Sequence, residues 1–169
     1  PIDGINMLCE TGLADHVLPE VPGMKLERDE HMQHKDVYRH SLTVLRQATE
    51  LEDEGPDLKL RWAALMHDIG KPATRAPKEG GGVTFHHHEV VGAKMVRKRM
   101  RALKYPKAVV EDVAEMALAA GAVHLGADHP VAAVHGGRHG ALDRLGRLPA
   151  RDVRRAQPHP RHRARHRRR

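Results

Sequence analysis

The stretch Leu65-Met66-His67-Asp68-Ile69-Gly70-Lys71-Pro72 places an adjacent histidine and aspartate at the end of an apolar helical segment. Apolar residues recur there at three-to-four-residue spacing, as expected for a buried helix face: Trp62, Leu65, Met66 and Ile69. Gly70 is a favoured residue just past a helix end, and Pro72 cannot continue a helix. The pattern therefore predicts that His67 and Asp68 lie in the last turn of a helix, next to a core.

A second histidine, His40, borders the apolar stripe of an earlier helical pattern. That stripe consists of Val37, Ser41, Val44, Ala48 and Leu51. Two histidines at the inner edges of consecutive helices, one followed directly by an aspartate, can together bind a divalent metal. On spacing alone an alternative stands, in which His40 is a hydrogen-bonded histidine at the core edge and Asp68 is a solvated helix end.

Three segments carry motifs that are specific in combination: 31–45 (HMQHKDVYRHSLTVL), 65–72 (LMHDIGKP) and 85–93 (FHHHEVVGA). Together they resemble the HD domain of bacterial CCA-adding tRNA nucleotidyltransferases and poly(A) polymerases, particularly those of high-GC bacteria. The resemblance runs from about residue 1 to about residue 116. It implies a helical, metal-dependent phosphohydrolase domain with His40, His67 and Asp68 at the positions of metal ligands. It also implies that His88 faces the metal or the substrate phosphate.

The composition favours packed helices. The 169 residues give room for one domain with its own core. Because aromatic residues are scarce, the core must consist of Leu, Val, Ala and Met, which suits helices better than a sheet. We expect an all-α HD-domain helical bundle in three parts: an N-terminal helix and connection at 1–34, an HD core at 35–120, and a biased tail at 121–169 with a disordered basic end.

Helix boundaries and loops follow from caps and breakers. A helix is expected from about Asp36, its N-cap, to Glu54, with Gly55 just past its end. Its acidic end, residues 50–54, opposes the helix dipole and indicates a solvated face rather than a second metal site. Asp57 can cap the next helix. Residues 73–82 contain three consecutive glycines and no phosphate-binding pattern, which predicts a mobile loop that could border the active site, before a helix at 89–104.

The net charge of +7 is a property of the tail. From Arg138 to Arg169 there are 12 Arg against two Asp, which gives +10 and leaves −3 for residues 1–137. The tail is rich in Ala, Gly, Arg, His and Pro without periodicity, so residues 150–169 are expected to be disordered. Two hypotheses stand for this composition: a basic nucleic-acid-binding tail, or a shifted reading frame of GC-rich DNA.

The tail also holds the candidate for a fourth metal ligand. The segment 150–153 (ARDV) is similar to the late family segment that contains the last aspartate of the HD ligand set, which makes Asp152 that candidate. Pro149, just before this segment, weakens the alignment, and Asp112 and Asp128 are alternatives. The cluster of His31 and His34 could also be ligand-like, although a solvated loop accounts for it as well.

The chemistry follows from this ligand set. Two imidazoles and two carboxylates suit Mg, Mn, Co, Ni or Zn, and such an ion activates water and polarises a phosphoryl group. Lys71 could neutralise charge on the phosphate, or simply favour a helix C-terminus; His88 could donate a proton or hydrogen bond to the leaving oxygen. With Asp68, these are the candidate catalytic residues. We expect hydrolysis of phosphomonoesters or 2′,3′-cyclic phosphodiesters in connection with tRNA 3′-end processing.

The sequence also indicates an RNA partner and limits the activity that is expected of this chain. Arg97, Lys98 and Arg101 form a basic run that would contact an RNA backbone such as tRNA, or simply be the wet face of a helix. The chain shows no counterpart of the family's nucleotidyltransferase head, so it is not expected to add nucleotides by itself. Two alternative functions stand: a free-standing nucleotide phosphohydrolase, and a non-catalytic RNA-binding fragment.

The expected location is the cytoplasm, with no membrane partner. Cys9 is the single cysteine, which excludes an internal disulfide and fits a reducing compartment. No apolar stretch approaches the roughly 18 to 20 residues that are needed to span a bilayer. The N-terminus also lacks a basic region followed by an apolar run.

Overall fold

The computed structural model describes residues 1–25 and 36–123, and these are mainly helical. The elements in chain order are α1 (Ile2–Glu10), α2 (Leu13–Val17), a 3-10 helix η1 (Pro22–Met24), α3 (Val37–Glu50), α4 (Leu58–Met66), α5 (Lys71–Thr74), β1 (Ala76–Pro77), β2 (Val83–Thr84), α6 (His88–Ala102) and α7 (Lys107–Val123). The expected all-α bundle is confirmed. None of the helices in these two ranges is long and apolar enough to cross a membrane.

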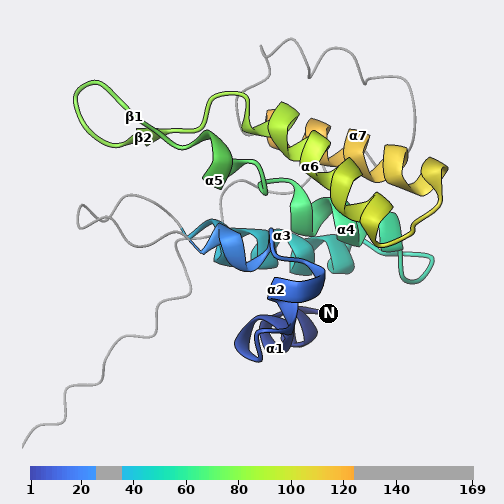
Figure 1. Ribbon diagram of the computed structural model, residues 1–169. Coiled ribbons are helices and arrows are strands. Elements are labelled where there is room, and N and C mark those ends of the chain that lie inside the picture. Colours follow the sequence, from blue (N-terminus) through green and yellow to red (C-terminus); the bar gives the residue numbers. More distant parts are fainter. Residues whose placement is uncertain (26–35, 124–169) are drawn as a thin grey trace, which may run out of the picture.

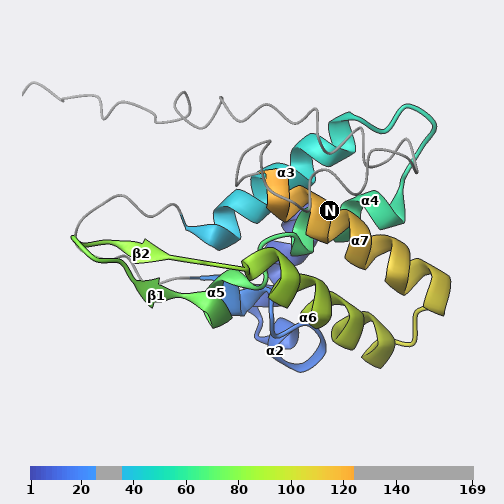
Figure 2. The ribbon, with the colours of Figure 1, turned by 90° about the horizontal axis from the view of Figure 1, so that it is seen from above.

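Four helices, α3, α4, α6 and α7, enclose the core. Helices α6 and α7 lie side by side, and α4 packs between α7 and α3 (Figures 1 and 2). The core is aliphatic, as the scarcity of aromatic residues predicts. Its most buried side chains include Leu60, Met66, Val96, Met100, Val110 and Val113. This packing brings the end of α4 against the start of α6, where the candidate site lies.

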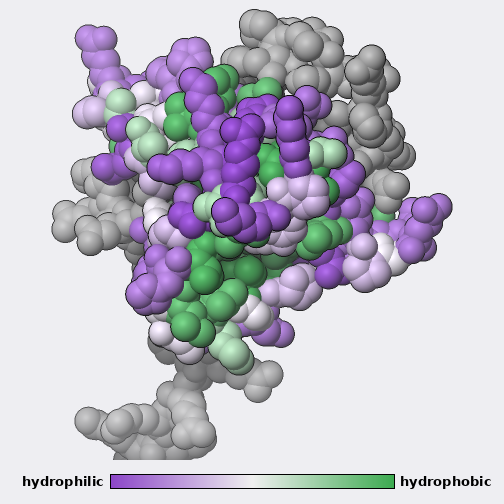
Figure 3. Space-filling view, turned by 45° about the vertical axis from the view of Figure 1, so that its right-hand side comes forward, coloured by the Kyte–Doolittle hydropathy of each residue, from purple (hydrophilic) through white to green (hydrophobic). Residues whose placement is uncertain are grey.

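The N-terminal segment is attached to the bundle by polar and apolar contacts. The hydroxyl of Tyr38 on α3 donates to Asn6 Oδ1 at 2.7 Å, and the Arg99 guanidinium on α6 holds both carboxylate oxygens of Glu20 at 2.8 to 3.0 Å. Three large apolar side chains remain exposed on α1 and α2: Met7, Leu13 and Val17. In Figure 3 an apolar area lies at the height that α1 and α2 occupy in Figure 1.

Helix α3 is shorter than the sequence predicts. Asp36 caps it as expected, accepting from the backbone N–H of Tyr38 at 3.0 Å, but the helix ends at Glu50 rather than at Glu54. The Glu52 carboxylate accepts two hydrogen bonds from Arg61, at 2.7 and 2.6 Å. The prediction of a solvated acidic face is therefore wrong for Glu52, whose side chain is 5 % exposed. A guanidinium partner stabilises this carboxylate better than the negative end of a helix dipole could.

Replacing Glu52 with glutamine is expected to lower the free energy of unfolding by about 1.5–3 kcal/mol near pH 7, because charge-assisted hydrogen bonds are lost. The Arg61 hydrogen bonds outweigh burial and hold the pKa of the Glu52 carboxyl below its ordinary value of 4.5. The pair therefore stabilises the fold above that pH, and the stabilisation is lost as the pH falls below it. Denaturation curves at about pH 7 and about pH 3 test this. A wild-type advantage that stays the same at the lower pH would contradict it.

The glycine-rich segment contains a short β-hairpin that projects from the bundle (Figures 1 and 2). Strands β1 and β2 pair antiparallel, with Ala76 opposite Thr84 and Pro77 opposite Val83. The turn is made by residues 80–82, three glycines with φ between 86° and 100°. Glycine adopts such positive φ angles without a steric penalty, which is why this sequence can reverse direction here. The sequence-predicted loop therefore has a defined central turn.

Candidate metal centre

His67 and Asp68 lie in the turn that follows α4, not in its last turn as the sequence predicts. Helix α4 ends at Met66, and the turn leads directly into α5. The backbone N–H of Lys71 donates to the Asp68 carbonyl at 3.0 Å. Pro72 sits in the first turn of α5, where its missing N–H is not needed, so it helps to start a helix rather than to stop one. Both His67 and Asp68 are buried.

Gly70 is needed for close packing and not for a helix cap. Its φ is −77°, an ordinary right-handed value, so the expected role as a glycine just past a helix end is wrong. A Cβ at this position would lie 2.1 Å from the His88 carbonyl oxygen and 2.7 Å from the Gly92 nitrogen. The missing side chain lets the turn lie directly against the start of α6. This close approach brings His88 beside Asp68.

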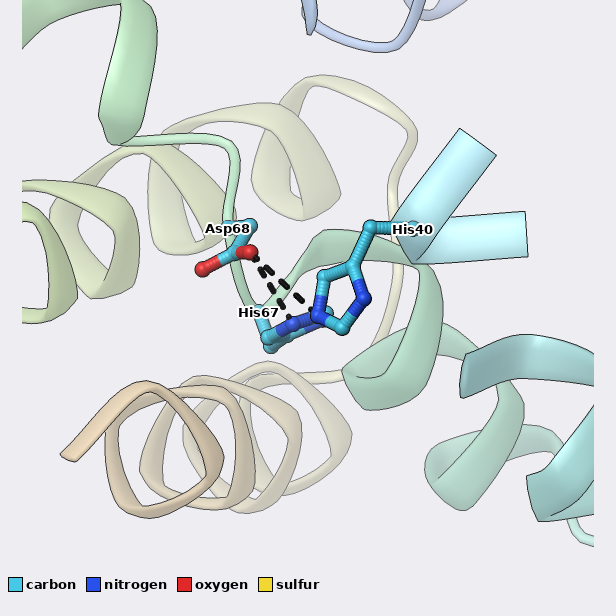
Figure 4. A group of neighbouring side chains, drawn as sticks. All are labelled: His40, His67 and Asp68. Atoms are coloured by element: carbon cyan, nitrogen blue, oxygen red, sulfur yellow. Dashed lines mark ion pairs between the residues drawn. The ribbon is translucent and has the colours of Figure 1, made fainter. Parts of the chain in front are cut away.

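His40, His67 and Asp68 converge on one point (Figure 4). The Nε2 atom of His67 lies 3.2 Å from Asp68 Oδ2, and the Nε2 atom of His40 lies 3.8 Å from the same oxygen. One ligand atom from each of the three residues lies within 4.8 Å of the others. His40 comes from α3, so the structure joins two segments that are 27 residues apart in sequence. Three of the four expected metal ligands are thus brought together.

The orientation of the His67 ring suits metal binding. Its Nδ1 lies 2.9 Å from the Ala64 carbonyl oxygen. Because a carbonyl only accepts, Nδ1 carries a hydrogen, and Nε2 is the atom that faces Asp68. An Nδ1–H held by a backbone carbonyl is the arrangement that typically supports a metal-ligating histidine. An imidazole lone pair and a carboxylate oxygen at 3.2 Å repel each other unless they share a cation, either a proton or a metal ion.

The spacing of these atoms also fits a divalent ion. Nitrogen and oxygen ligands lie about 2.0–2.2 Å from such ions, which separates neighbouring ligand atoms by about 3 to 3.5 Å. The distances of 3.2 and 3.8 Å to Asp68 Oδ2 are close to that range. Two imidazoles and one carboxylate are also ligands that Mn, Co, Ni and Zn accept. The residues therefore fit a metal site that other groups must complete.

Two further cationic or proton-bearing groups face Asp68. The Lys71 ammonium donates to Oδ2 at 2.5 Å, and His88 Nε2 lies 3.4 Å from Oδ1. Burial by itself would raise the pKa of the Asp68 carboxyl. The charge and hydrogen bond of His67, together with His88 and Lys71, outweigh burial and hold that pKa well below its ordinary value. Asp68 is therefore an anion that is available to bind a cation.

The structure separates the members of the His86-His87-His88 triplet. His86 and His87 are exposed, whereas His88 is buried at the first position of α6. His87 has a φ of 59°, a left-handed conformation that reverses the chain just before the helix. The three histidines therefore lie in different environments. Only His88 reaches the candidate site.

The remaining expected site residues are placed elsewhere or lie outside the described ranges. Arg97 and Arg101 both pair with Glu111 on α7, at 2.6 and 2.8 Å, which leaves Lys98 as the one of the three that is in no ion pair with another described residue. Asp112 pairs with Lys59 at 2.6 Å and is not part of the His40, His67 and Asp68 cluster. The other candidate ligands lie outside the described residues: Asp152, Asp128, His31 and His34.

Sequence reasoning missed one buried acid at the site, Glu89. This residue is 1 % exposed and follows His88 in the first turn of α6. A signal was present, because Glu89 shares a three-to-four-residue spacing with the buried Gly92, Val96 and Met100. That spacing places a carboxylate on the inner face of the helix. Nothing about the amino-acid type alone indicates it, since a Glu near a helix start is also an ordinary favourable charge.

Several known proteins are similar to this chain. An A-adding tRNA nucleotidyltransferase from Deinococcus radiodurans is 37 % identical over 114 residues, which cover 67 % of this chain and 26 % of that protein. A CC-adding tRNA nucleotidyltransferase from Thermus thermophilus is 37 % identical over 112 residues, which cover 66 % of this chain and 26 % of that protein. A multifunctional CCA protein from Legionella pneumophila is 32 % identical over 114 residues, which cover 64 % of this chain and 25 % of that protein. The chain spans about a quarter of the length of these relatives.

The family match covers the bundle and the converging side chains. Residues 37–156 match the model of the HD domain, and they contain His40, His67, Asp68 and His88. The range also includes position 152. Because the match covers more than half of the 169 residues, this chain belongs to the HD domain family.

Proposed function

We propose that this chain is a metal-dependent HD-type phosphohydrolase domain of a protein related to CCA-adding tRNA nucleotidyltransferases. In this proposal it hydrolyses phosphomonoesters or 2′,3′-cyclic phosphodiesters in connection with tRNA 3′-end processing. The observation that carries the proposal is the convergence of His40, His67 and Asp68 on one buried point. The similarity to tRNA nucleotidyltransferases supports the link to tRNA.

His40, His67 and Asp68 would hold a divalent ion, with Mg, Mn, Ni and Co as the leading candidates. Asp152 is proposed as the fourth ligand, and the extent of the family match to residue 156 supports it. When bound, the ion supplies Lewis-acid activation of water and of a phosphoryl oxygen.

The chain's own residues would bind and orient the phosphate. Lys71 is held 2.5 Å from Asp68 Oδ2 and is 17 % exposed, so its ammonium is fixed at the site and can offset phosphate charge. His88 approaches from the opposite carboxylate oxygen of Asp68 and is proposed to give a proton or hydrogen bond to the leaving oxygen. The hydrolytic reaction adds water across the P–O bond: water gives oxygen to phosphorus, and the leaving oxygen takes a proton.

The proposal is tested by measuring hydrolysis of 2′,3′-cyclic AMP and p-nitrophenyl phosphate with Mg, Mn, Co, Ni and Zn. We expect turnover with at least one of these metals, and loss of turnover when a chelator removes it. Absence of turnover with every metal, from protein shown to be folded by circular dichroism, would contradict the proposal. Competition by tRNA against the small substrates then distinguishes a tRNA-associated domain from a free-standing nucleotide phosphohydrolase.

A tRNA contact on α6 is the second part of the proposal, and we infer that Lys94 and Lys98 carry it rather than Arg97 and Arg101. Arg97 and Arg101 are each paired with Glu111. Lys94 and Lys98 lie one turn apart on the exposed side of α6, and neither is in an ion pair with another residue of the described ranges. Unpaired lysines on one helix face can bind phosphates without sequence preference.

The double variant Lys94→Gln with Lys98→Gln is expected to weaken tRNA binding severalfold and to reduce the slope of log K against log salt by roughly 1.5, because two phosphate contacts are lost. Filter binding across a salt series measures both quantities. Lys59→Gln is the matched control, since Lys59 is exposed but pairs with Asp112. If the double variant keeps the wild-type slope, this face of α6 is only the solvated side of the helix.

A further inference from the structure

Glu89 is a buried acid that lies beside His88 at the start of α6. Its side chain has no exposed surface, and α7 covers it closely: a Cβ at Gly121 would lie 2.9 Å from Glu89 Cβ. Burying an ionised carboxylate costs several kcal/mol unless the charge is paired. One of its oxygens, Oε2, lies 3.5 Å from Nδ1 of His88. A buried carboxyl group therefore lies directly beside the His88 ring.

The His88 ring has acceptors on both sides. Its Nδ1 lies 2.9 Å from the Phe85 carbonyl oxygen as well as near Glu89, and its Nε2 faces Asp68 Oδ1 at 3.4 Å. If Nδ1 lacked a hydrogen, its lone pair would face a carbonyl and a carboxylate together, which is electrostatically unfavourable. Nδ1 thus faces two acceptors, one of them at hydrogen-bond distance, whereas Nε2 faces one carboxylate oxygen at longer range, and this difference favours a hydrogen on Nδ1.

We propose that Glu89 is a positioning residue: its buried carboxylate, together with the Phe85 carbonyl, fixes the His88 ring with Nδ1–H directed at them and Nε2 directed at Asp68. The Phe85 carbonyl supplies the hydrogen-bond geometry, and Glu89 supplies the charge that holds the hydrogen at Nδ1. Because His88 and Glu89 are consecutive residues at the start of α6, the group that orients the ring belongs to the same helix as the ring. His88 Nε2 is then presented to the site irrespective of which substrate binds.

The role of His88 in turnover rests on the proposed function, whereas the orientation of its ring does not. The experiment therefore has two readouts on Glu89→Gln, Glu89→Met and the wild-type chain. The first is the imidazole ¹H–¹⁵N spectrum of His88 in the metal-free protein, with Nδ1 and Nε2 assigned by comparison with His88→Asn. The second is kcat and KM for p-nitrophenyl phosphate with the most active metal.

We expect the wild-type spectrum to show a protected hydrogen on His88 Nδ1. In Glu89→Gln this signal should weaken, because a neutral amide attracts the N–H less than a carboxylate does, and Glu89→Met should lose it further. The value of kcat should fall by about 10–100-fold, the usual effect of removing a group that orients a functional histidine, with a smaller change in KM. Glu52→Gln is the matched control: it also removes a buried carboxylate, but one that pairs with Arg61. It should leave the His88 spectrum unchanged.

An unchanged Nδ1 signal in folded Glu89→Gln would overturn the proposal, and this holds even if Glu89→Met fails to fold. The spectrum also separates this proposal from the proposed function. If the Nδ1 signal changes as expected but the wild-type chain shows no turnover, the positioning role stands and the hydrolase function fails. A fall in kcat with an unchanged spectrum would mean that Glu89 acts by another route, and the positioning role would be wrong.

Discussion

Replacing Asp68 with alanine is expected to abolish metal-dependent hydrolysis, with a loss of at least about 10³-fold in kcat/KM. Asp68 is the one carboxylate in the described cluster, and its Oδ2 is approached by His40, His67 and Lys71. In the Asp68→Ala variant, the two imidazoles would have to hold a divalent ion with no anionic ligand beside them. Each tenfold loss of rate corresponds to about 1.4 kcal/mol of lost transition-state stabilisation, so a 10³-fold loss corresponds to about 4 kcal/mol.

Asp68→Asn and Asp57→Asn form the matched pair that tests the charge alone. Asp68→Asn keeps the shape of the side chain but removes its negative charge, so metal binding measured by calorimetry should weaken together with turnover. Asp57→Asn makes the same chemical change at the N-cap of α4, where asparagine caps as well as aspartate does, and should keep full activity. Helical content should be retained in both, since Asp68 lies in a turn. Wild-type turnover by Asp68→Asn would exclude Asp68 as a metal ligand.

Replacing Gly70 with alanine is expected to destabilise the fold by about 3–5 kcal/mol and to lower Tm by roughly 10 °C or more. The new Cβ would lie 2.1 Å from the His88 carbonyl oxygen and 2.7 Å from the Gly92 nitrogen, and both are backbone atoms that cannot move aside as a side chain could. The turn and the start of α6 must therefore separate. Thermal and denaturant unfolding measure the effect.

Gly4→Ala is the matched control for Gly70→Ala. Gly4 lies inside α1, and a Cβ there meets nothing within 4 Å. Alanine should therefore stabilise the helix by about 0.5–1 kcal/mol, because glycine loses more backbone entropy on folding. If Gly70→Ala unfolds at the same temperature as the wild-type chain, the close approach between the turn and α6 is not required.

Metal-dependent activity in Gly70→Ala should fall even where the protein remains folded. Separating the turn from α6 moves His88 away from Asp68, which it faces at 3.4 Å in the wild-type arrangement. His40 and His67 do not come from α6, so metal binding should be less affected than turnover. Comparing calorimetric metal affinity with kcat distinguishes these two effects.

Local patterns predicted the helices well because their causes are local. Asp36 and Asp57 accept hydrogen bonds from backbone N–H groups two and three residues ahead, so the cap residue and its target are neighbours in sequence. The apolar spacing around Leu65 and Met66 likewise predicted a buried face, and both residues are buried. Only the detail of the ends differed, as where Glu52 left the helix to pair with Arg61.

The roles of the glycines and of the histidine triplet could not be read from local patterns. Gly70 looks like a helix-ending residue in sequence, yet its small size serves contact with α6, a segment that begins 18 residues later. His86, His87 and His88 are chemically identical, and only the fold, in which His87 has a left-handed backbone and His88 begins α6, shows that His88 is the buried one. Arg97 and Arg101 read as a basic run until Glu111 on α7 is seen to pair with both.

The sequence by itself determined the helical class and the family resemblance, and it indicated His40, His67, Asp68 and His88 as candidate site residues, because hydrophobic spacing, caps and motifs are encoded by residues close together in the chain. The tertiary structure alone decided that His40 reaches Asp68, that Lys71 and His88 face the two oxygens of that carboxylate, and that Glu89 is buried beside His88. These features depend on how closely and at what angle separate helices pack. That geometry is set by the volume and charge of all the side chains between them, which no single stretch of sequence contains.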